Sequence, residues 1–380
     1  MMQPLIRSLF PLSAALVAAA LVVAGCAGPT DRDADRIGLR ADVALPRRRG
    51  SVVVDGCVLD TWTRATLASA ATRRVLQEVI MLCLVPREDG TVGPRDPSAR
   101  AALGALADDL RRDGYRVSFG VAFTDESGQR YDGKQTRELL ANRLWLARFA
   151  ETLPLVAAPA DGIEIDLQQL PNDAAAEVAA LVAEAARVVR PAKQLGVFVP
   201  PSVTVPSDLP GGDAFNRAAL APNVDRIRIM TLDYSEAEPG PTIDPGWAVD
   251  AVRLARSDFA AVDVAFPLYG TDFGPRGRRP VTYHEARAIA AISGAPIERG
   301  PTGAPFVRYL AFGGEPHQLW FDDAESTGLA LGAWSLEVLP ADVGVLFYGL
   351  GAEDPALFDR LAERLEGGLA TRADTRKRMP

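Results

Sequence analysis

Residue types and loops that hold cofactors are scarce in this sequence. Its 380 residues include 2 histidines and 3 cysteines, and no group of His, Cys and Asp has the spacing of metal ligands. His284 falls in a helical pattern and His317 in a hairpin turn, so packing or surface roles suit both. No strand-like run is followed by a glycine-rich GxGxxG or GKS/T loop, and no Ser-His-Asp arrangement has a motif around it. We therefore expect neither a metal nor an organic cofactor.

Positive charge is also in deficit. The chain has 41 Lys and Arg against 49 Asp and Glu, a net charge of −8 and a pI near 5.1. No basic stripe occurs before the last few residues, so nucleic acid is not an expected partner. The remaining composition, 48% hydrophobic and 24% charged, is that of a globular chain long enough for a large core.

The N-terminus has the pattern of a secretion signal. "MMQPLIRSLFPLSAALVAAALVVAGCAG" places Arg7 ahead of an apolar run from Leu9 to about Val23, and small residues precede Cys26. This ending resembles the lipobox of bacterial lipoproteins, which implies cleavage before Cys26 and a diacylglyceryl group on its sulfur. The alternative is an uncleaved anchor, although the run is short for a span and lacks a positive stop-transfer flank. Either way, we expect a protein outside the cytoplasm and tethered to a membrane. Because Ala27 follows the cysteine, nothing argues for the inner membrane, and the outer membrane or cell surface is expected.

The regions beside the folded body show no apolar period. With a signal peptide over 1–25, we expect a solvated tether over 26–50 and a disordered tail over 370–380, which leaves 51–369 as the folded body. In it, Cys57 and Cys83 could pair in an oxidising compartment. Two small buried apolar residues are the simpler interpretation.

Strand-like apolar runs alternate with helical patterns along the folded body. Eight such runs predict parallel β/α units and a closed (β/α)₈ TIM barrel. An open, doubly wound sheet is the alternative, which the lack of a glycine-rich loop weakens. The runs cover residues 51–59, 78–86, 115–123, 161–170, 194–201, 224–234, 262–270 and 328–339.

A small insertion is predicted between the seventh and eighth strands. Residues 271–320 hold the helix candidate "TYHEARAIAAI", and the hairpin candidate "FVRYLAFGGEPHQLWFDD" has Gly-Gly at its turn. The position of the insertion places it on the face of the barrel where active sites lie.

The fourth strand carries polar residues where an apolar strand is expected. A parallel barrel strand is buried on both faces, yet "DGIEIDLQQL" alternates Glu164, Asp166 and Gln168 with apolar residues. Period two points all three side chains the same way. Unpaired carboxylates inside a barrel are costly, so they either line a solvent-reaching pocket or are paired internally.

This strand and several others resemble, in order, the motifs of the family 18 glycoside hydrolases, which include chitinases and endo-β-N-acetylglucosaminidases. The family's fourth-strand motif, DGxDxDxE, stands here as residues 161–168 and ends in Gln168. The resemblance covers about residues 51 to 350. The other matching segments are "SFGV" (118–121), "MTLDY" (230–234), "PLYG" (267–270), "WFDDAES" (320–326) and "GAWSLE" (332–337).

The resemblance implies a substrate-assisted glycosidase site. In the family, the terminal Glu of the motif protonates the glycosidic oxygen, and the middle Asp orients the N-acetyl group that attacks the anomeric carbon. By position, Asp166 keeps the orienting role and Trp334 becomes the floor of the sugar pocket. The candidate catalytic residues are Asp161, Glu164, Asp166 and Gln168, and the candidate substrate-binding residues are Met230, Asp233, Tyr269, Trp334 and Glu337.

Two departures from the family pattern affect the chemistry most. Gln168 stands where the acid is expected, and an amide has no acidic proton to give. General acid catalysis supplies about 10²–10⁴-fold in rate. Leu232 replaces a Tyr that hydrogen-bonds the acetamido group. Glu164 lies about four residues, roughly 13 Å, deeper along the strand, so it is poorly placed to replace the acid.

Three functions are compatible with this pattern. The first is a membrane-tethered protein that binds a glycan containing N-acetylglucosamine, such as peptidoglycan or chitin, without hydrolysing it. The second is an active glycosidase that uses another carboxylate, such as Glu337 or one in the insertion. The third is a protein-binding scaffold with a closed groove.

Strand parity also places Arg228 inside the barrel. Residues 226, 228, 230 and 232 share one face of the sixth strand. If Met230 points inward, Arg228 does too, where it can meet Glu164 or Asp166 and balance their charge.

The lipobox generates the first testable prediction. Cys26 is expected to be the lipid-bearing N-terminal residue of the mature protein, so Cys26→Ser should move most of the protein from the membrane fraction to the soluble fraction. Sedimentation of membranes followed by immunoblotting measures this. A Cys26→Ser variant that sediments to the wild-type extent would contradict the assignment.

Overall fold

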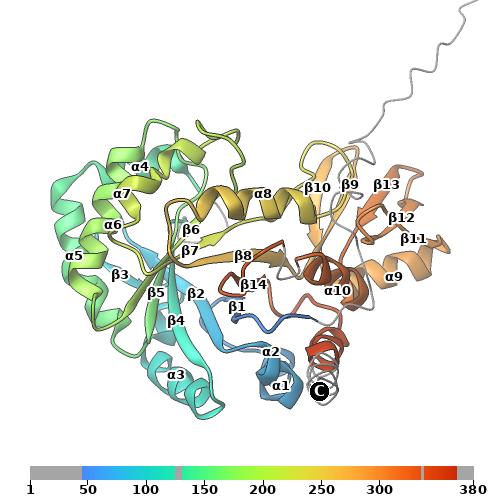
Figure 1. Ribbon diagram of the computed structural model, residues 1–380, viewed down its shortest axis with the longest axis horizontal. Coiled ribbons are helices and arrows are strands. Elements are labelled where there is room, and N and C mark those ends of the chain that lie inside the picture. Colours follow the sequence, from blue (N-terminus) through green and yellow to red (C-terminus); the bar gives the residue numbers. More distant parts are fainter. Residues whose placement is uncertain (1–44, 125–130, 335–337, 366–380) are drawn as a thin grey trace, which may run out of the picture.

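The computed structural model describes residues 45–124, 131–334 and 338–365 (Figure 1). A barrel and a smaller sheet form this part of the chain. No helix within it has the length and apolarity to cross a bilayer.

The barrel is a closed ring of parallel strands, as the sequence predicts. Its nine-stranded sheet runs in the order β1-β14-β8-β7-β6-β5-β4-β2-β3, and pairing between β1 and β2 closes the ring. The ninth strand, β3 (Val92–Pro94), adds antiparallel to the end of β2. The eight parallel strands are β1 (Gly50–Asp55), β2 (Glu78–Pro86), β4 (Arg116–Ala122), β5 (Gly162–Asp166), β6 (Gln194–Val199), β7 (Arg226–Ile229), β8 (Val262–Pro267) and β14 (Gly344–Tyr348).

Helices cover the outside of the ring (Figure 1). Helix α6 shows why: Val178, Leu181, Val182 and Ala185 recur at helical spacing and are buried. The helices around the barrel are α1 (Thr61–Ala68), α2 (Ala70–Val75), α3 (Leu103–Arg112), α4 (Gly133–Leu140), α5 (Arg143–Ala157), α6 (Ala175–Val189), α7 (Arg217–Leu220), α8 (Pro245–Ala255) and α10 (Ala324–Ala333), with short 3₁₀ turns at Pro97–Ala101 and Gly212–Ala214.

The prediction of the eighth strand over residues 328–339 is wrong. The first half of that run, residues 328–333, lies in helix α10, which begins with a capping box between Asp323 and Ser326. A short apolar run cannot be distinguished from a buried helix by its periodicity. The eighth strand is β14, "GVLFY", which pairs with β1 and β8.

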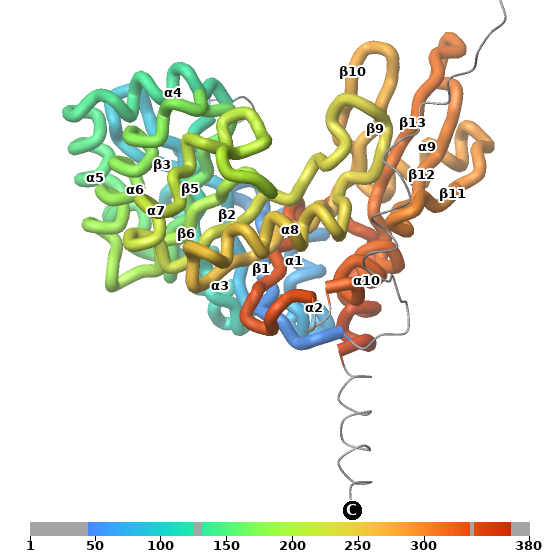
Figure 2. The backbone as a smooth tube through the Cα atoms, turned by 45° about the horizontal axis from the view of Figure 1, so that its top comes forward, coloured from blue at the N-terminus to red at the C-terminus, as the bar shows by residue number. Residues whose placement is uncertain are grey.

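The insertion between β8 and α10 forms a second sheet with a helix on one face. The sheet runs β10-β9-β13-β12-β11 and is antiparallel, and helix α9 (Tyr283–Ser293) follows β10. Its hairpins project beyond the barrel (Figure 2). The strands are β9 (Gly270–Gly274), β10 (Gly277–Val281), β11 (Ile297–Arg299), β12 (Pro305–Leu310) and β13 (Pro316–Trp320).

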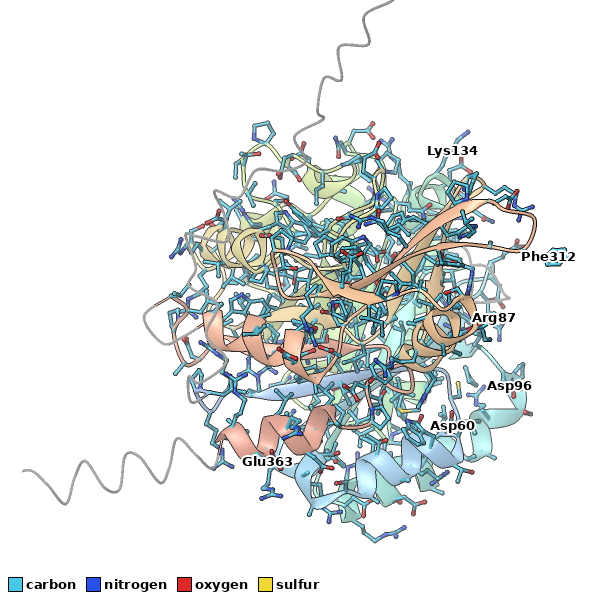
Figure 3. All side chains as sticks on the ribbon, turned by 90° about the vertical axis from the view of Figure 1, so that its right-hand side faces the viewer. Asp60, Arg87, Asp96, Lys134, Phe312 and Glu363 are labelled. Atoms are coloured by element: carbon cyan, nitrogen blue, oxygen red, sulfur yellow. The ribbon has the colours of Figure 1, made fainter. Side chains whose placement is uncertain are left out.

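The predicted hairpin and its turn are confirmed. Gly313 and Gly314 have φ of 94° and 81°, a conformation that side chains disfavour. Phe312 in the same turn is fully exposed and points away from the molecule (Figure 3). The insertion leaves and rejoins the barrel at one place. Its first residue, Gly270, lies so close to Trp320 at the end of β13 that a Cβ on Gly270 would overlap the Trp320 carbonyl.

A cluster of opposite charges fills the lower part of the barrel. Arg228 is 1% exposed and contacts carboxylates from three strands. Its Nη2 lies 2.7 Å from Glu164 Oε1 and 2.8 Å from Glu78 Oε2, and its Nη1 bonds Asp263. The prediction that Arg228 points inward is therefore confirmed, with Glu164 rather than Asp166 as the partner.

The cluster is balanced in charge. Arg226 lies 3.6 Å from Glu78 and 3.5 Å from Asp263, and Arg49 also binds Asp263, so three guanidinium groups face three carboxylates. Burial, the largest single cause, raises the pKa of Glu78, but the charge and hydrogen bond of Arg228, the charge of Arg226 and a hydrogen bond from Ser118 together hold that pKa at about 2. A buried ion pair is tolerated only when its charges are compensated in this way.

Small residues make room for the cluster. Gly196 of β6 faces Glu164, and a Cβ at Gly196 would overlap both carboxylate oxygens. Above the cluster, the interior is apolar: Val53, Ile80, Phe198, Ala265 and Leu346 pack together. Outside the barrel interior, Cys57 and Cys83 are buried free thiols, as the simpler interpretation predicts.

The tight fit at Gly196 generates the second prediction. Gly196→Ala should lower the free energy of unfolding by about 3 kcal/mol, because overpacking forces apart a buried ion cluster. Gly104→Ala is the control, since nothing lies within 4 Å of its added methyl group in helix α3. That change should be neutral or stabilise by up to about 1 kcal/mol. Urea denaturation followed by circular dichroism measures both, and equal stability of the two variants would contradict the packing account.

Candidate functional site

The candidate site lies at the barrel mouth, where the strands end. Parallel strands deliver their last side chains to the same rim. Asp166 is the final residue of β5, and Tyr348 is the final residue of β14. The segments after β7 and β8 add Leu232, Asp233 and Tyr269.

Asp166 is the buried carboxylate at this rim. It is 1% exposed and accepts a hydrogen bond from the Tyr131 hydroxyl at 2.5 Å. Burial raises the pKa of Asp166 to about 6, and hydrogen bonds from Tyr131 and Gln168 only partly oppose this shift. Within the part of the chain that the structure describes, no cation pairs with Asp166, whereas Arg228 pairs with Glu164 below it.

Gln168 contacts Asp166 directly. Its Nε2 lies 3.2 Å from Asp166 Oδ1 and 3.4 Å from Oδ2. The amide therefore uses its donor group on the carboxylate. It is partly exposed, so it can also meet a ligand at the mouth, but it has no acidic proton to transfer.

A second polar group lies on the segment after β7. Asp233 has φ of 55°, and its Oδ1 accepts from the Tyr269 hydroxyl at 2.9 Å. Its Oδ2 lies 3.5 Å from Nη1 of Arg278 in the insertion. Burial, and then the charge of Asp233, raises the pKa of Tyr269 well above its usual value. The Tyr269 hydroxyl therefore acts as a neutral hydrogen-bond donor.

Tyr348 lies near both Asp166 and Asp233. Burial and the charge of Asp166 are the two largest causes that raise the pKa of its hydroxyl, and Asp233 contributes as well. Its ring packs on the apolar interior beside Met230 and Leu232. Sequence reasoning missed Tyr348, as it missed Tyr131. The available signal was the apolar run "GVLFY", which is a strand of ordinary length.

A buried carboxyl anchors the loop between β7 and α8. Asp322 accepts hydrogen bonds from Thr242 of this loop and from Ser326 of α10. Burial raises the pKa of Asp322 to about 6. The contact ties the segment that carries Leu232 and Asp233 to the helix before β14.

Trp334 does not occupy the position that the resemblance assigned to it. It follows helix α10, is 0% exposed, and packs edge-on against Phe266 at 6.1 Å between ring centres. Its Nε1 donates to the Pro245 carbonyl oxygen at 3.1 Å. It belongs to the core between strands and helices, so it cannot form the floor of a sugar pocket.

The other candidate residues lie in three places: the mouth, the charge cluster and the start of β5. Asp166, Gln168, Asp233 and Tyr269 lie at the mouth, and Met230 packs just below it. Glu164 lies in the charge cluster, away from the mouth. Asp161 precedes β5, where it accepts from the Val117 amide at 2.8 Å and from Arg111. Glu337 lies outside the described residues.

The mouth has hydrogen-bonding groups and an aromatic ring. Within residues 45–124, 131–334 and 338–365, no group of three or more His, Cys, Asp or Glu residues could hold a metal ion. The arrangement suits recognition of a polar ligand with acceptor and donor groups. Proton transfer by Gln168 is excluded.

Comparison with solved structures shows the same fold. The spore cortex-lytic enzyme SleL of Bacillus cereus matches with a TM-score of 0.70 and 16% identity, over 84% of this chain and 75% of that one. A chitinase from Chromobacterium violaceum matches with a TM-score of 0.68 and 19% identity, over 83% and 98%. A class V chitinase mutant from Nicotiana tobaccum, in complex with NAG4, matches with a TM-score of 0.64 and 13% identity, over 84% and 99%. No protein-family model matches the sequence, and no curated protein is detectably similar.

The raised pKa of Asp166 generates the third prediction. The unfolded chain ionises this group near pH 4 and the folded protein near pH 6, so the folded state binds more protons between these values. Ionisation of Asp166 therefore lowers the free energy of unfolding as the pH rises from about 4 to about 6. Asp166→Asn should remove this loss.

The measurement is the unfolding free energy of wild type and Asp166→Asn at pH 4 and pH 7.5. Two pKa units at about 1.4 kcal/mol each give a relative gain of about 3 kcal/mol for the variant at the higher pH. Asp108→Asn, at an exposed carboxylate on α3, controls for a surface change. A difference between wild type and Asp166→Asn that does not vary with pH would contradict the prediction.

Proposed function

We propose that this protein is a membrane-tethered, extracytoplasmic relative of the family 18 glycoside hydrolases that binds glycan containing N-acetylglucosamine without hydrolysing it. The lipobox at Cys26 supports the tether and the location. Three observations support a glycan as the ligand: the barrel, the fold that it shares with chitinases and a cortex-lytic enzyme, and the ordered motifs. The site for that glycan is the barrel mouth.

The contact between Gln168 and Asp166 carries the proposal. Substrate-assisted hydrolysis needs a proton at the leaving oxygen and a carboxylate that orients the acetamido group. Asp166 keeps the second function, and Gln168 lacks the first. Leu232 packs on the apolar interior and offers no hydrogen bond to the acetamido group. Two interactions with the transition state are therefore missing, while the groups that bind the ground state are retained.

Binding is supported by the groups at the mouth. Tyr348 replaces Trp334 as the aromatic side chain available to a sugar ring, and the Tyr269 hydroxyl, the Asp233 carboxylate and the Gln168 amide supply hydrogen bonds. The tobacco chitinase in complex with NAG4 is itself a glutamate-to-glutamine mutant. A barrel of this fold with such a change can thus hold an N-acetylglucosamine oligomer.

The fourth prediction concerns activity and binding at this mouth. Wild type should bind chitotetraose and release no fluorophore from a fluorogenic chitobioside. Gln168→Glu alone should give little activity. The activity of the double variant Gln168→Glu with Leu232→Tyr should exceed that of either single variant by about tenfold or more, because both groups act on one transition state and are non-additive.

Tyr348→Ala should weaken binding of chitotetraose about tenfold, as loss of a large aromatic contact does.

Phe312→Ala is the matched control, since this aromatic residue is exposed far from the mouth. Turnover assays and titration calorimetry provide the readouts. Robust turnover by wild type would favour the active glycosidase with another carboxylate. Absence of oligosaccharide binding would favour the protein-binding scaffold.

A further inference from the structure

A row of four side chains crosses the insertion sheet. Arg278 of β10 is paired with Phe273 of β9, Phe273 with Gln318 of β13, and Gln318 with Arg308 of β12. Directly opposed residues of antiparallel strands project to the same face. At about 4.8 Å per strand, the two arginine Cα atoms are about 14 Å apart. We call these four residues the arginine row.

The row faces an open groove. Helix α9 covers the other face of the sheet, where Val307 and Leu319 pack against Ala286 and Ala290. The alternate positions on the strands, including the row, therefore point away from α9. The row lines part of a cavity of about 940 Å³, together with Glu236, Ala237 and Pro239 of the segment after β7 and with residues at the end of α9.

The two arginines hold replaceable partners. Arg278 Nη2 lies 2.9 Å from Glu236, whose side chain is 68% exposed, and Arg308 Nη1 lies 3.2 Å from Glu298, whose side chain is 48% exposed. Exposed ion pairs of this kind contribute little free energy. A ligand carboxylate can exchange with either glutamate at small cost. Phe273, 7% exposed, is the buried floor between the two cations.

The arginine row begins at the barrel mouth. Arg278 also faces Asp233, which belongs to the candidate site, and Glu236 follows Asp233 by three residues on the same segment. The two hairpins that carry the row project from one side of the molecule (Figure 2). A polymer held at the mouth therefore extends along the groove and over the row.

We propose that the arginine row is a carboxylate-binding subsite, and that the glycan is a polymer of N-acetylglucosamine whose alternate sugars carry carboxylates. This inference rests on the proposed function and names its ligand class. Guanidinium groups bind carboxylates through paired, charge-assisted hydrogen bonds. The Gln318 amide between them can donate to and accept from hydroxyl or acetamido groups. The protein carries a net charge of −8, so the row supplies attraction that its surface as a whole does not.

The test compares tetrasaccharides of equal length by titration calorimetry. Chitotetraose is neutral. A tetramer alternating N-acetylglucosamine with N-acetylmuramic acid carries lactyl carboxylates, and one alternating with glucuronic acid carries uronate carboxylates. We expect wild type to bind at least one acidic tetramer about tenfold more tightly than chitotetraose, a difference of about 1.4 kcal/mol. The tighter acidic tetramer identifies the source of the carboxylate.

Variants assign the preference to the row. The double change Arg278→Gln and Arg308→Gln should bring the affinity ratio of acidic to neutral tetramer, measured on the same variant, close to one. Arg276→Gln is the matched control, because this arginine lies on the same hairpin, is 84% exposed and pairs with Glu315. That variant should keep the wild-type ratio. Amidation of the tetramer carboxylates should abolish the preference of the wild type.

Three results would overturn the inference. Equal binding of neutral and acidic tetramers by wild type would remove the subsite and leave the proposed function intact. A preference that persists in the double variant would place carboxylate recognition elsewhere. Failure of wild type to bind any of the three tetramers would overturn the proposed function together with this inference.

Discussion

The ion cluster around Arg228 determines how the barrel interior is divided. One guanidinium group bonds carboxylates that come from β2, β5 and β8, so strands that are not neighbours are joined at one level. Removing any single partner would leave a buried charge uncompensated. The cluster fills the lower interior, the apolar layer packs above it, and the polar side chains of the mouth lie beyond that layer.

The same strand supplies two carboxylates with different surroundings. Glu164 and Asp166 are two residues apart on β5 and share a face, yet their surroundings differ. Glu164 lies among cations, whereas Asp166 contacts a hydroxyl and an amide. One carboxylate therefore contributes to the fold through its pairing with Arg228, although burial still raises its pKa. The other carries an unfavourable charge, which a ligand with an N–H donor would stabilise.

The sequence predicted features that depend on strand parity and failed where they depend on longer-range pairing. Parity alone placed Arg228 and Glu164 inside the barrel together. The eighth strand was misplaced because the segment "GAWSLE" resembles the family's eighth strand, and it directly follows an apolar run that lies in helix α10. Trp334 was assigned to the mouth for the same reason. Tyr348 was missed although it ends the apolar run "GVLFY", because that run was not taken as a strand. The arginine row depends on register between β9 and β13, which are more than 40 residues apart, and no spacing in the sequence reports it.

The insertion leaves and rejoins the barrel at a single place, where Gly270 lies against the Trp320 carbonyl. Because its two ends are adjacent, the tips of its hairpins can change in length and surface without shifting the barrel strands, although Arg278 and Tyr283 also contact barrel loops. The charge cluster and the Asp166 pocket are built entirely from the barrel and its loops. Substitutions in the insertion can therefore change the residues that line the groove while the charge cluster of the barrel stays the same. In this architecture the groove surface can evolve separately from the barrel interior.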